Sequence, residues 1–229
     1  MARKLVQPYA GARLLDYGCG DGTFLAEVRD LFPTAVGADI DLKQTLDCRK
    51  RFAAMSEISF VLTEELASAS RESAYDIVTC MEVLEHCLDQ HRDQVLLDLH
   101  RLVSLDGIII ISVPIEIGPT LIGKQLVRTL AGWRGLGDYK YNERYTTYEL
   151  FRMVFAGERT AIPRPFYSDG NGTGFHLHKG FSWRTLRTQL REHFNVRQVH
   201  FSPLGWLGGY FSSQAWFICE PRKVSIGCA

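Results

Sequence analysis

Three glycines at alternate positions, Gly18, Gly20 and Gly22, follow an acidic residue, Asp16, near the start of the chain. Glycine adopts positive φ and has no Cβ, so a ligand can lie directly against the main chain of such a turn. A dinucleotide-binding turn has the spacing G-x-G-x-x-G, which places a pyrophosphate at a helix N-terminus. The spacing here is G-x-G-x-G, and the preceding carboxylate repels phosphate. The motif therefore favours a positively charged ligand.

A second acidic position lies at the end of the next apolar run, Ala35–Asp41. In a parallel α/β sheet, ligands bind outside the carboxyl ends of the strands, where an acid can accept both hydroxyls of a ribose. We predict this role for Asp39, with Ile40 packed on an adenine face. An acid at this point can also cap the following helix, and the neighbouring Asp41 is an alternative to Asp39.

Two segments resemble motifs of a known family. Leu14–Leu25 is similar to the first motif of class I S-adenosylmethionine-dependent methyltransferases, whose cofactor carries an ammonium and a sulfonium. Tyr75–Cys87 resembles the fourth-strand motif of that family, particularly the branch of ubiquinone-biosynthesis O-methyltransferases. The resemblance implies S-adenosylmethionine as cofactor and S-adenosylhomocysteine as product. The cofactor-binding residues it implies are Asp16, Gly18, Cys19, Gly20, Asp39, Ile40, Cys80 and Met81.

The strand and helix patterns alternate along most of the chain, which favours a doubly wound α/β sheet with helices on both faces. The resemblance implies seven mostly parallel strands in a Rossmann-like methyltransferase fold, with residues 1–229 as one domain. The predicted strands are Arg13–Tyr17, Ala35–Asp41, Ile58–Leu62, Tyr75–Met81, Ile108–Val113, Val196–Phe201 and Ser213–Cys219.

The alternation lapses between residues 115 and 180, after the fifth predicted strand. The segment contains an apolar helical stripe from Leu121 to Leu130, a capping box formed by Thr146 and Glu149, and a loop rich in proline and glycine. It is too long for a simple connection. We predict an insertion that forms a lid over the cofactor pocket and recognises the substrate.

Methyl transfer is an in-line displacement in which the acceptor must be held about 3 Å from the methyl group. An oxygen or nitrogen acceptor also needs a base with a pKa near neutrality, and histidine has one. His86 follows the fourth strand, and His176 and His178 precede the last predicted helix. We predict His86 and His178 as catalytic residues. The alternative is that these side chains only hydrogen-bond to neighbouring loops.

The sequence Glu82-x-x-Glu85-His86, together with His176 or His178, is similar to the metal-binding pattern of small-RNA 3′-end 2′-O-methyltransferases. In those enzymes two carboxylates and two histidines hold a divalent ion, and such a set would suit magnesium or manganese polarising a pair of hydroxyls. The same letters occur in family members that are not expected to bind metal. The sequence therefore predicts no metal ligand, and a divalent metal stays as the alternative.

The composition narrows the class of partner. The 229 residues, 46% hydrophobic and 23% charged, suffice for one domain with a large core. Because 26 basic and 26 acidic residues cancel, the net charge does not favour nucleic acid or a membrane. Residues 124–200 hold 13 basic and 6 acidic residues, which indicates an anionic or sugar-linked substrate if these side chains are not simply solvated.

The six cysteines form no C-x-x-C pair and are expected to be reduced. No signal-like segment or membrane-spanning apolar run is present in the sequence, so we expect a cytoplasmic protein.

The first interpretation is a methyltransferase acting on an oxygen, or less favourably a nitrogen, of a small molecule. The alternatives are an RNA 2′-O-methyltransferase with a divalent metal and a non-catalytic module that binds S-adenosylmethionine. The glycine spacing argues against a nicotinamide oxidoreductase. The sequence leaves the oligomeric state open.

Overall fold

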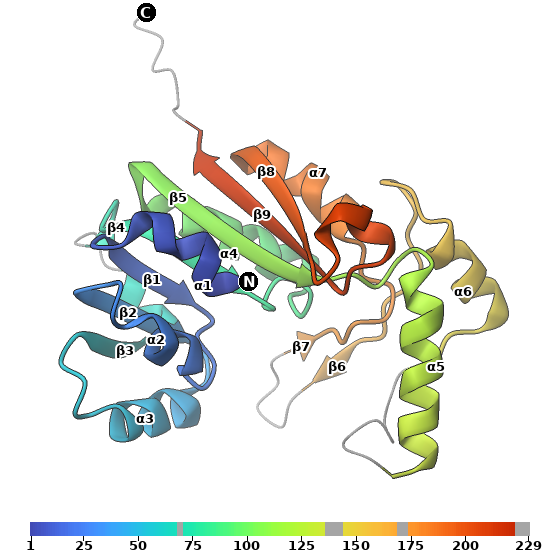
Figure 1. Ribbon diagram of the computed structural model, residues 1–229, viewed down its shortest axis with the longest axis horizontal. Helices are drawn as coiled ribbons and strands as arrows, with labels where there is room; N and C mark the ends of the chain where they lie inside the picture. Colours follow the sequence, from blue (N-terminus) through green and yellow to red (C-terminus); the bar gives the residue numbers. More distant parts are fainter. Residues whose placement is uncertain (68–70, 136–143, 169–173, 223–229) are drawn as a thin grey trace, which may run out of the picture.

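A seven-stranded sheet with the order β3-β2-β1-β4-β5-β9-β8 forms the centre of the protein (Figure 1). The computed structural model describes residues 1–67, 71–135, 144–168 and 174–222. The neighbouring strands β3, β2, β1, β4 and β5 pair in parallel, whereas β9 runs antiparallel to both β5 and β8. The predicted doubly wound, mostly parallel sheet is confirmed. Its strands are β1 (Arg13–Tyr17), β2 (Thr34–Asp39), β3 (Ile58–Leu62), β4 (Tyr75–Met81), β5 (Val103–Pro114), β8 (Phe194–Ser202) and β9 (Gln214–Pro221).

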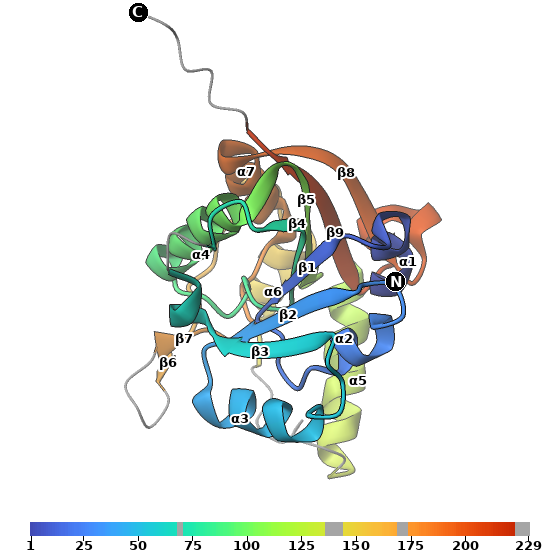
Figure 2. The ribbon, with the colours of Figure 1, turned by 90° about the vertical axis from the view of Figure 1, so that its left-hand side faces the viewer.

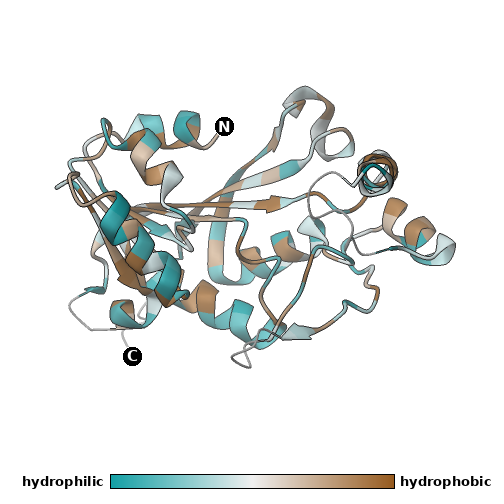
Figure 3. Cartoon of the chain, turned by 90° about the horizontal axis from the view of Figure 1, so that it is seen from below, coloured by the Kyte–Doolittle hydropathy of each residue, from teal (hydrophilic) through white to brown (hydrophobic). Residues whose placement is uncertain are grey.

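Helices cover both faces of this sheet (Figure 2). Adjacent strand residues point to opposite faces, so Leu14 of β1 belongs to one hydrophobic cluster and Leu15 to the other. The Leu14 cluster packs under α1 (Ala2–Val6), α2 (Thr23–Val28) and α3 (Leu42–Arg51). The Leu15 cluster packs under α4 (Asp89–Leu102) and α7 (Trp183–His193). Figure 3 shows hydrophobic strands between helices that carry hydrophilic residues.

Several predicted strand boundaries were wrong. Strand β2 ends at Asp39 rather than Asp41, because the carboxylate of Asp41 accepts a hydrogen bond from the amide of Gln44 and caps α3. Strand β5 begins at Val103 rather than Ile108, with a register shift against β4. Within it, a Cβ at Gly107 would lie 2.8 Å from the carbonyl oxygen of Asp76. Strand β8 extends beyond both of its predicted ends, and β9 runs from Gln214 to Pro221 rather than from Ser213 to Cys219.

The segment 115–180 contains two helices and a short hairpin, which gather beyond the C-terminal end of β5 (Figure 1). The predicted helical stripe lies in α5 (Thr120–Trp133), and the predicted capping box opens α6 (Thr147–Val154). The sequence predicted an irregular loop where β6 (Tyr167–Ser168) pairs with β7 (Gly174–Phe175). Residues 136–143 and 169–173 of the predicted insertion lie outside the described residues.

Most of the apolar stripe of α5 faces outward. Leu121 is fully buried, but Trp133 is 84% exposed. The other exposed apolar residues of this helix are Ile122, Leu126, Val127 and Leu130. The role of the segment as a lid therefore stays a prediction. None of the helices in the described part of the chain combines the length and the apolar character needed to cross a bilayer.

Candidate active site

The glycine turn between β1 and α2 folds back onto the end of β2. Gly18, Gly20 and Gly22 all have positive φ, at 78°, 52° and 72°. The amides of Gly18 and Cys19 donate to the carbonyl of Ala38 at 2.7 and 3.0 Å. The amide of Gly20 donates to the carboxylate of Asp39 at 2.9 Å. Glycine is required here because side chains rarely adopt these φ values.

The three glycines differ in what a side chain would meet. At Gly18 a Cβ would overlap the side chain of Val83, and at Gly22 it would lie 2.8 Å from the Phe52 and Phe60 rings. At Gly20 it would meet only the side-chain nitrogen of Gln44, at 3.5 Å. From the sequence, we expected all three glycines to open the main chain to a ligand. The structure corrects this reason: Gly18 and Gly22 make room for the protein's own side chains, and Gly20 borders open space.

Asp16 is a buried carboxylate at the C-terminal end of β1, with 2% of its surface exposed. The hydroxyl of Thr79, on the neighbouring strand β4, donates to it at 2.7 Å. Burial raises the pKa of Asp16 to about 7, the Thr79 bond opposes this rise, and the charge of Asp39 adds to it. A positively charged ligand would favour its ionised form.

The carboxylate of Asp39 is fixed by the main chain on both sides. One oxygen accepts from the amide of Gly20 and the other from the amide of Asp41, each at 2.9 Å. The alternative role for Asp39 was to cap the following helix. Asp41 caps α3 instead, so Asp39 does not have this role. Asp39 therefore stands at the carboxyl end of β2, where a ribose would lie in this class of sheet.

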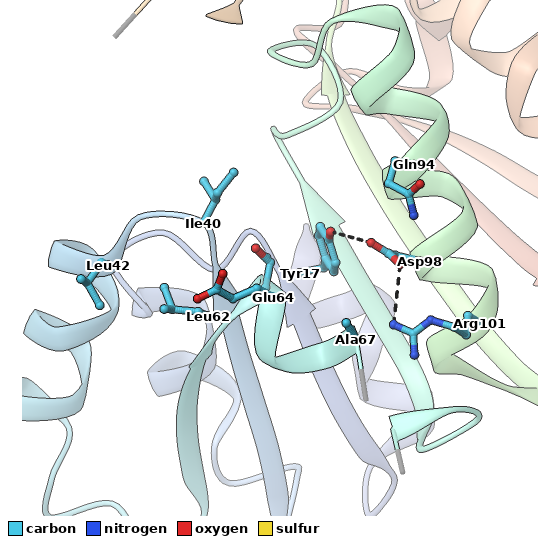
Figure 4. A pocket seen from close by; sticks show the side chains of 10 residues that line it. Tyr17, Ile40, Leu42, Leu62, Glu64, Ala67, Gln94, Asp98 and Arg101 are labelled. Atoms are coloured by element: carbon cyan, nitrogen blue, oxygen red, sulfur yellow. Dashed lines mark hydrogen bonds and ion pairs between the residues drawn. The ribbon is translucent and has the colours of Figure 1, made fainter. Parts of the chain in front are cut away.

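A cavity of about 540 Å³ lies beside this strand end (Figure 4). Ile40, Leu62 and Thr63 line one side of it, and Glu64 points its carboxylate toward it. On the other side the hydroxyl of Tyr17 donates to Asp98 at 3.4 Å, and Arg101 pairs with Asp98 at 3.6 Å. Ile40 is 76% exposed, so it offers apolar surface to a flat ring.

Cys80 and Met81, the other predicted cofactor residues, differ in exposure. The Cys80 side chain is fully buried in the core beneath α4. No part of Cys80 is exposed in this structure, so its predicted contact with the cofactor stays a prediction. Met81 is partly buried and packs against the opposite cluster.

His86 and His178 lie side by side beyond the end of β4, with ring centroids 5.2 Å apart. The Nδ1 of His86 lies 2.9 Å from the carbonyl oxygen of His176, and the His176 amide donates back to the His86 carbonyl at 3.0 Å. These bonds tie the loop after β4 to the segment before α7. The pKa of His86 is lowered by burial, which outweighs its bond to the His176 carbonyl. His86 is therefore neutral near pH 7.

Glu85 lies beside this histidine pair and is fully buried. Burial, together with repulsion from Glu82, raises the pKa of Glu85 to about 9. Glu82 has the left-handed φ of 56°, and its carboxylate accepts from the hydroxyl of Ser112 at 2.9 Å. Residues other than glycine adopt this backbone conformation only at a cost in free energy. Such backbone strain tends to occur at functional sites.

Sequence reasoning missed Glu116, a fully buried acid just after β5. Its carboxylate lies 3.1 Å from Lys124, 2.8 Å from Arg128 and 3.7 Å from the Nδ1 of His178. Burial alone would raise its pKa, but hydrogen bonding from His178 and Arg128 and the nearby positive charges lower it to about 2. The sequence did offer a signal for Glu116, because this acid lies between two isoleucines and is therefore expected to be buried. A buried acid needs hydrogen-bonding or charged partners.

Arg164 was also missed. Its guanidinium donates to the carbonyls of Glu85, Leu177 (2.9 Å) and Lys179 (3.4 Å). Arg164 thus bridges the loop after β4 and the segment that carries His178. No sequence pattern marked it, because its partners are backbone atoms far away in the chain.

A family model described as a methyltransferase domain matches residues 2–152. The ubiquinone biosynthesis O-methyltransferase of Ruegeria pomeroyi is 30% identical over 154 residues, which cover 65% of this chain and 60% of that protein. The mitochondrial one of Schizosaccharomyces pombe is 30% identical over 127 residues, 54% of this chain and 44% of that protein. The matches thus span less than two thirds of these relatives.

Solved structures show the same fold at lower identity. The PH0226 protein from Pyrococcus horikoshii has a TM-score of 0.63 at 14% identity, covering 96% of this chain and 90% of that one. A Burkholderia thailandensis 1,6-didemethyltoxoflavin-N1-methyltransferase, solved with S-adenosylhomocysteine, has a TM-score of 0.59 at 15% identity, covering 97% and 77%. With the sheet order and the family match over residues 2–152, these findings show that the chain belongs to the S-adenosylmethionine-dependent methyltransferase family.

Proposed function

We propose that this protein transfers a methyl group from S-adenosylmethionine to an oxygen of a small molecule. The observation that carries the proposal is the edge formed by β1, β2 and β4. There a buried carboxylate (Asp16), a main-chain-fixed carboxylate (Asp39) and a glycine that borders open space (Gly20) come together. The cofactor would supply an electrophilic methyl group and needs no activation by the protein.

The residues at this edge fit the cofactor. Asp39 would accept the ribose hydroxyls, and Ile40 and Leu62 would pack on the adenine in the adjacent cavity. Glu64 points its carboxylate toward that cavity, so we assign the contact with the adenine amino group to Glu64. Asp16 would balance the positive charge of the cofactor, which removes the energetic cost of its buried carboxylate.

The two histidines supply the base. His86 is neutral near pH 7, and 38% of its side chain reaches solvent, so it can take a proton from an acceptor hydroxyl. His178 is similarly accessible, at 36%, and the carboxylate of Glu116 orients its ring. Arg164 holds the segment that carries His86 and the segment that carries His178 in fixed positions relative to each other.

The acceptor class follows from the charge of the second half of the chain. An anionic or sugar-linked acceptor suits the basic excess of residues 124–200. Part of this excess is already offset from outside the segment, because Lys124 and Arg128 pair with Glu116.

Calorimetry with S-adenosylmethionine tests the cofactor site. The native chain and a Gly11→Ala control should bind, because a Cβ at Gly11 meets nothing within 4 Å. Gly18→Arg and Asp39→Ala should bind weakly or not at all. Native-like binding by Gly18→Arg would contradict the assignment of the pocket. A screen of hydroxylated metabolites with a labelled methyl donor then identifies the acceptor.

An RNA 2′-O-methyltransferase is the second candidate, favoured by the grouping of Glu85, His86 and His178. Such an enzyme should bind RNA with an affinity that falls steeply as salt rises. Cofactor binding without methylation of RNA or of any small molecule would instead support the non-catalytic module.

A further inference from the structure

A second cavity, of about 420 Å³, lies where α4 and α7 begin. It shares no lining residue with the cavity beside β2 that we assign to the cofactor. Among the described residues, two arginines, Arg92 and Arg164, and one acid, Asp89, line it. Positive side chains therefore outnumber negative ones around this cavity.

Arg92 is a buried cation with an unpaired donor. It lies in the first turn of α4, and only 6% of its surface is exposed. Its Nη2 donates to the Oδ1 of Asp89, but its buried Nε has no hydrogen-bond partner within the described part of the chain. Buried polar groups are normally hydrogen-bonded, because leaving one unpaired is unfavourable. An acceptor is therefore expected beside the Nε of Arg92.

Asp89 satisfies only part of this guanidinium. The Nε and Nη2 groups point from the same edge of the planar group, where one carboxylate or phosphate can accept two parallel hydrogen bonds. Asp89 accepts from Nη2 alone, and its own side chain is 85% exposed. An ion pair with such an exposed acid contributes little stability. An anion that accepted from both nitrogens would therefore displace Asp89.

The helix ends at the cavity also favour an anion. The N-terminus of a helix carries a partial positive charge and main-chain N–H groups that point outward. Leu88, the residue before α4, has no polar side chain that could cap this end. At the start of α7 the buried hydroxyl of Ser182 accepts from the amide of Thr185, so its own proton can be donated to a ligand in the cavity.

We propose that this cavity binds an oxyanion, the phosphate or carboxylate group of a small molecule, with the Nε and Nη2 of Arg92 as its main donors. On binding, the carboxylate of Asp89 leaves Arg92 and turns to solvent. The positive ends of α4 and α7 and the charge of Arg164 add to the attraction. The two arginines and the Ser182 hydroxyl provide the donors that a phosphate or carboxylate needs.

The place of the cavity gives the anion a use in the proposed methyl transfer. His176 lines the cavity, and its carbonyl oxygen lies 2.9 Å from the Nδ1 of His86, the base in that proposal. An acceptor anchored here by an anionic group would thus lie next to the segment that holds the base. This use rests on the proposed function, whereas anion binding does not. A native protein that binds the anion but not S-adenosylmethionine would refute the methyltransferase proposal and leave the cavity site standing.

Nuclear magnetic resonance titrations of the isotope-labelled native protein test the site. Inorganic phosphate and sodium acetate are added separately, with sodium chloride keeping the ionic strength constant. The Nε–H signal of Arg92, identified by its absence from Arg92→Gln, should shift and reach saturation. Saturation by phosphate alone indicates a phosphate group as the natural ligand, and saturation by acetate alone indicates a carboxylate.

Four variants then measure the contribution of each charge, with affinities taken from the main-chain amide signals at the start of α7. Arg92→Gln removes both donors and should weaken binding at least about 10-fold. Asp89→Asn removes the competing carboxylate and should strengthen binding about 2- to 5-fold. Asp93→Asn and Arg191→Gln change the net charge equally, at exposed positions that do not line the cavity, and should bind like the native protein.

Melting curves of each variant separate loss of the site from misfolding. Asp89→Asn is expected to fold normally because its side chain is exposed, so its gain in affinity tests the proposal even if Arg92→Gln is unstable. The proposal is overturned if neither anion shifts the Arg92 signal of the native protein. It is also overturned if Asp89→Asn binds no more tightly than Asp93→Asn.

Discussion

The buried carboxylate of Asp16 makes a prediction about stability as well as binding. Its pKa is about 7 in the folded protein, whereas an unperturbed aspartate carboxyl has a pKa of 3.8. The folded protein thus holds this proton over a pH range in which the unfolded chain has lost it. The stabilising contribution is complete below pH 3.8 and is lost progressively as pH rises to 7.

Asp16→Asn should remove this dependence and keep the acceptor for the Thr79 hydroxyl. Each pKa unit corresponds to about 1.4 kcal/mol. From pH 5 to pH 8 the native protein should therefore lose about 3 kcal/mol relative to the variant. For a domain of this size that is a difference of about 6 to 12 °C in Tm.

Thermal melts of the cofactor-free proteins at pH 5 and pH 8 measure the effect. Asp76→Asn is the control, because its pairing with Arg13 lowers the pKa of Asp76 to about 2. The Asp76 contribution is lost only as pH falls toward 2, so that variant should shift Tm equally at both pH values. The reasoning about Asp16 is refuted if Asp16→Asn shows the same change in Tm from pH 5 to pH 8 as the native protein.

Cofactor binding should show the complementary behaviour. A cationic ligand favours the ionised carboxylate, so native affinity for S-adenosylmethionine should rise between pH 5 and pH 8. Asp16→Asn should bind more weakly at pH 8, with a smaller dependence on pH. Equal affinities for the two proteins at pH 8 would show that Asp16 does not balance the charge of the ligand.

Three further substitutions test the scaffold around the site. Gly18→Ala should lower Tm more than Gly11→Ala in melting experiments. Both positions have positive φ, but only at Gly18 would the added Cβ meet a side chain. Equal decreases in Tm would contradict this packing explanation. Asp41→Ala should cost about 1 kcal/mol through loss of the α3 cap, measured by urea denaturation, and no loss would show that the cap is not needed. Arg164→Ala should cost about 1 to 3 kcal/mol by the same assay, since it leaves carbonyl groups without their donor, and an unchanged stability would exclude the bridging role.

The sequence located most of the sheet because buried parallel strands carry a strong local signal. The isoleucine run in β5 and the apolar runs ending at Tyr17 and Met81 were readable without any distant partner. The start of β5 was not readable, because its first residues pair with β4 only through a register shift. The hairpin of β6 and β7 was missed for a similar reason, since each strand has only two residues.

The site was predicted less completely than the sheet. The glycine turn and Asp39 stand close together in sequence and have characteristic spacing, so they were visible as a motif. The grouping of His86 with His178, and of His178 with Glu116, depends on how segment 115–180 folds back on the sheet. Such contacts join residues far apart in the chain, and no local pattern encodes them.

The bridge made by Arg164 has a consequence for redesigning the protein. The guanidinium of Arg164 donates to the carbonyl of Glu85 and to the carbonyl of Leu177. The loop that carries His86 and the loop that carries His178 are therefore expected to move together. A chimera that replaces the segment after β5 also replaces Arg164, so the bridge to the Glu85 carbonyl persists only if the new segment supplies an equivalent arginine. Acceptor preference is therefore expected to transfer between homologues only when both loops are moved together.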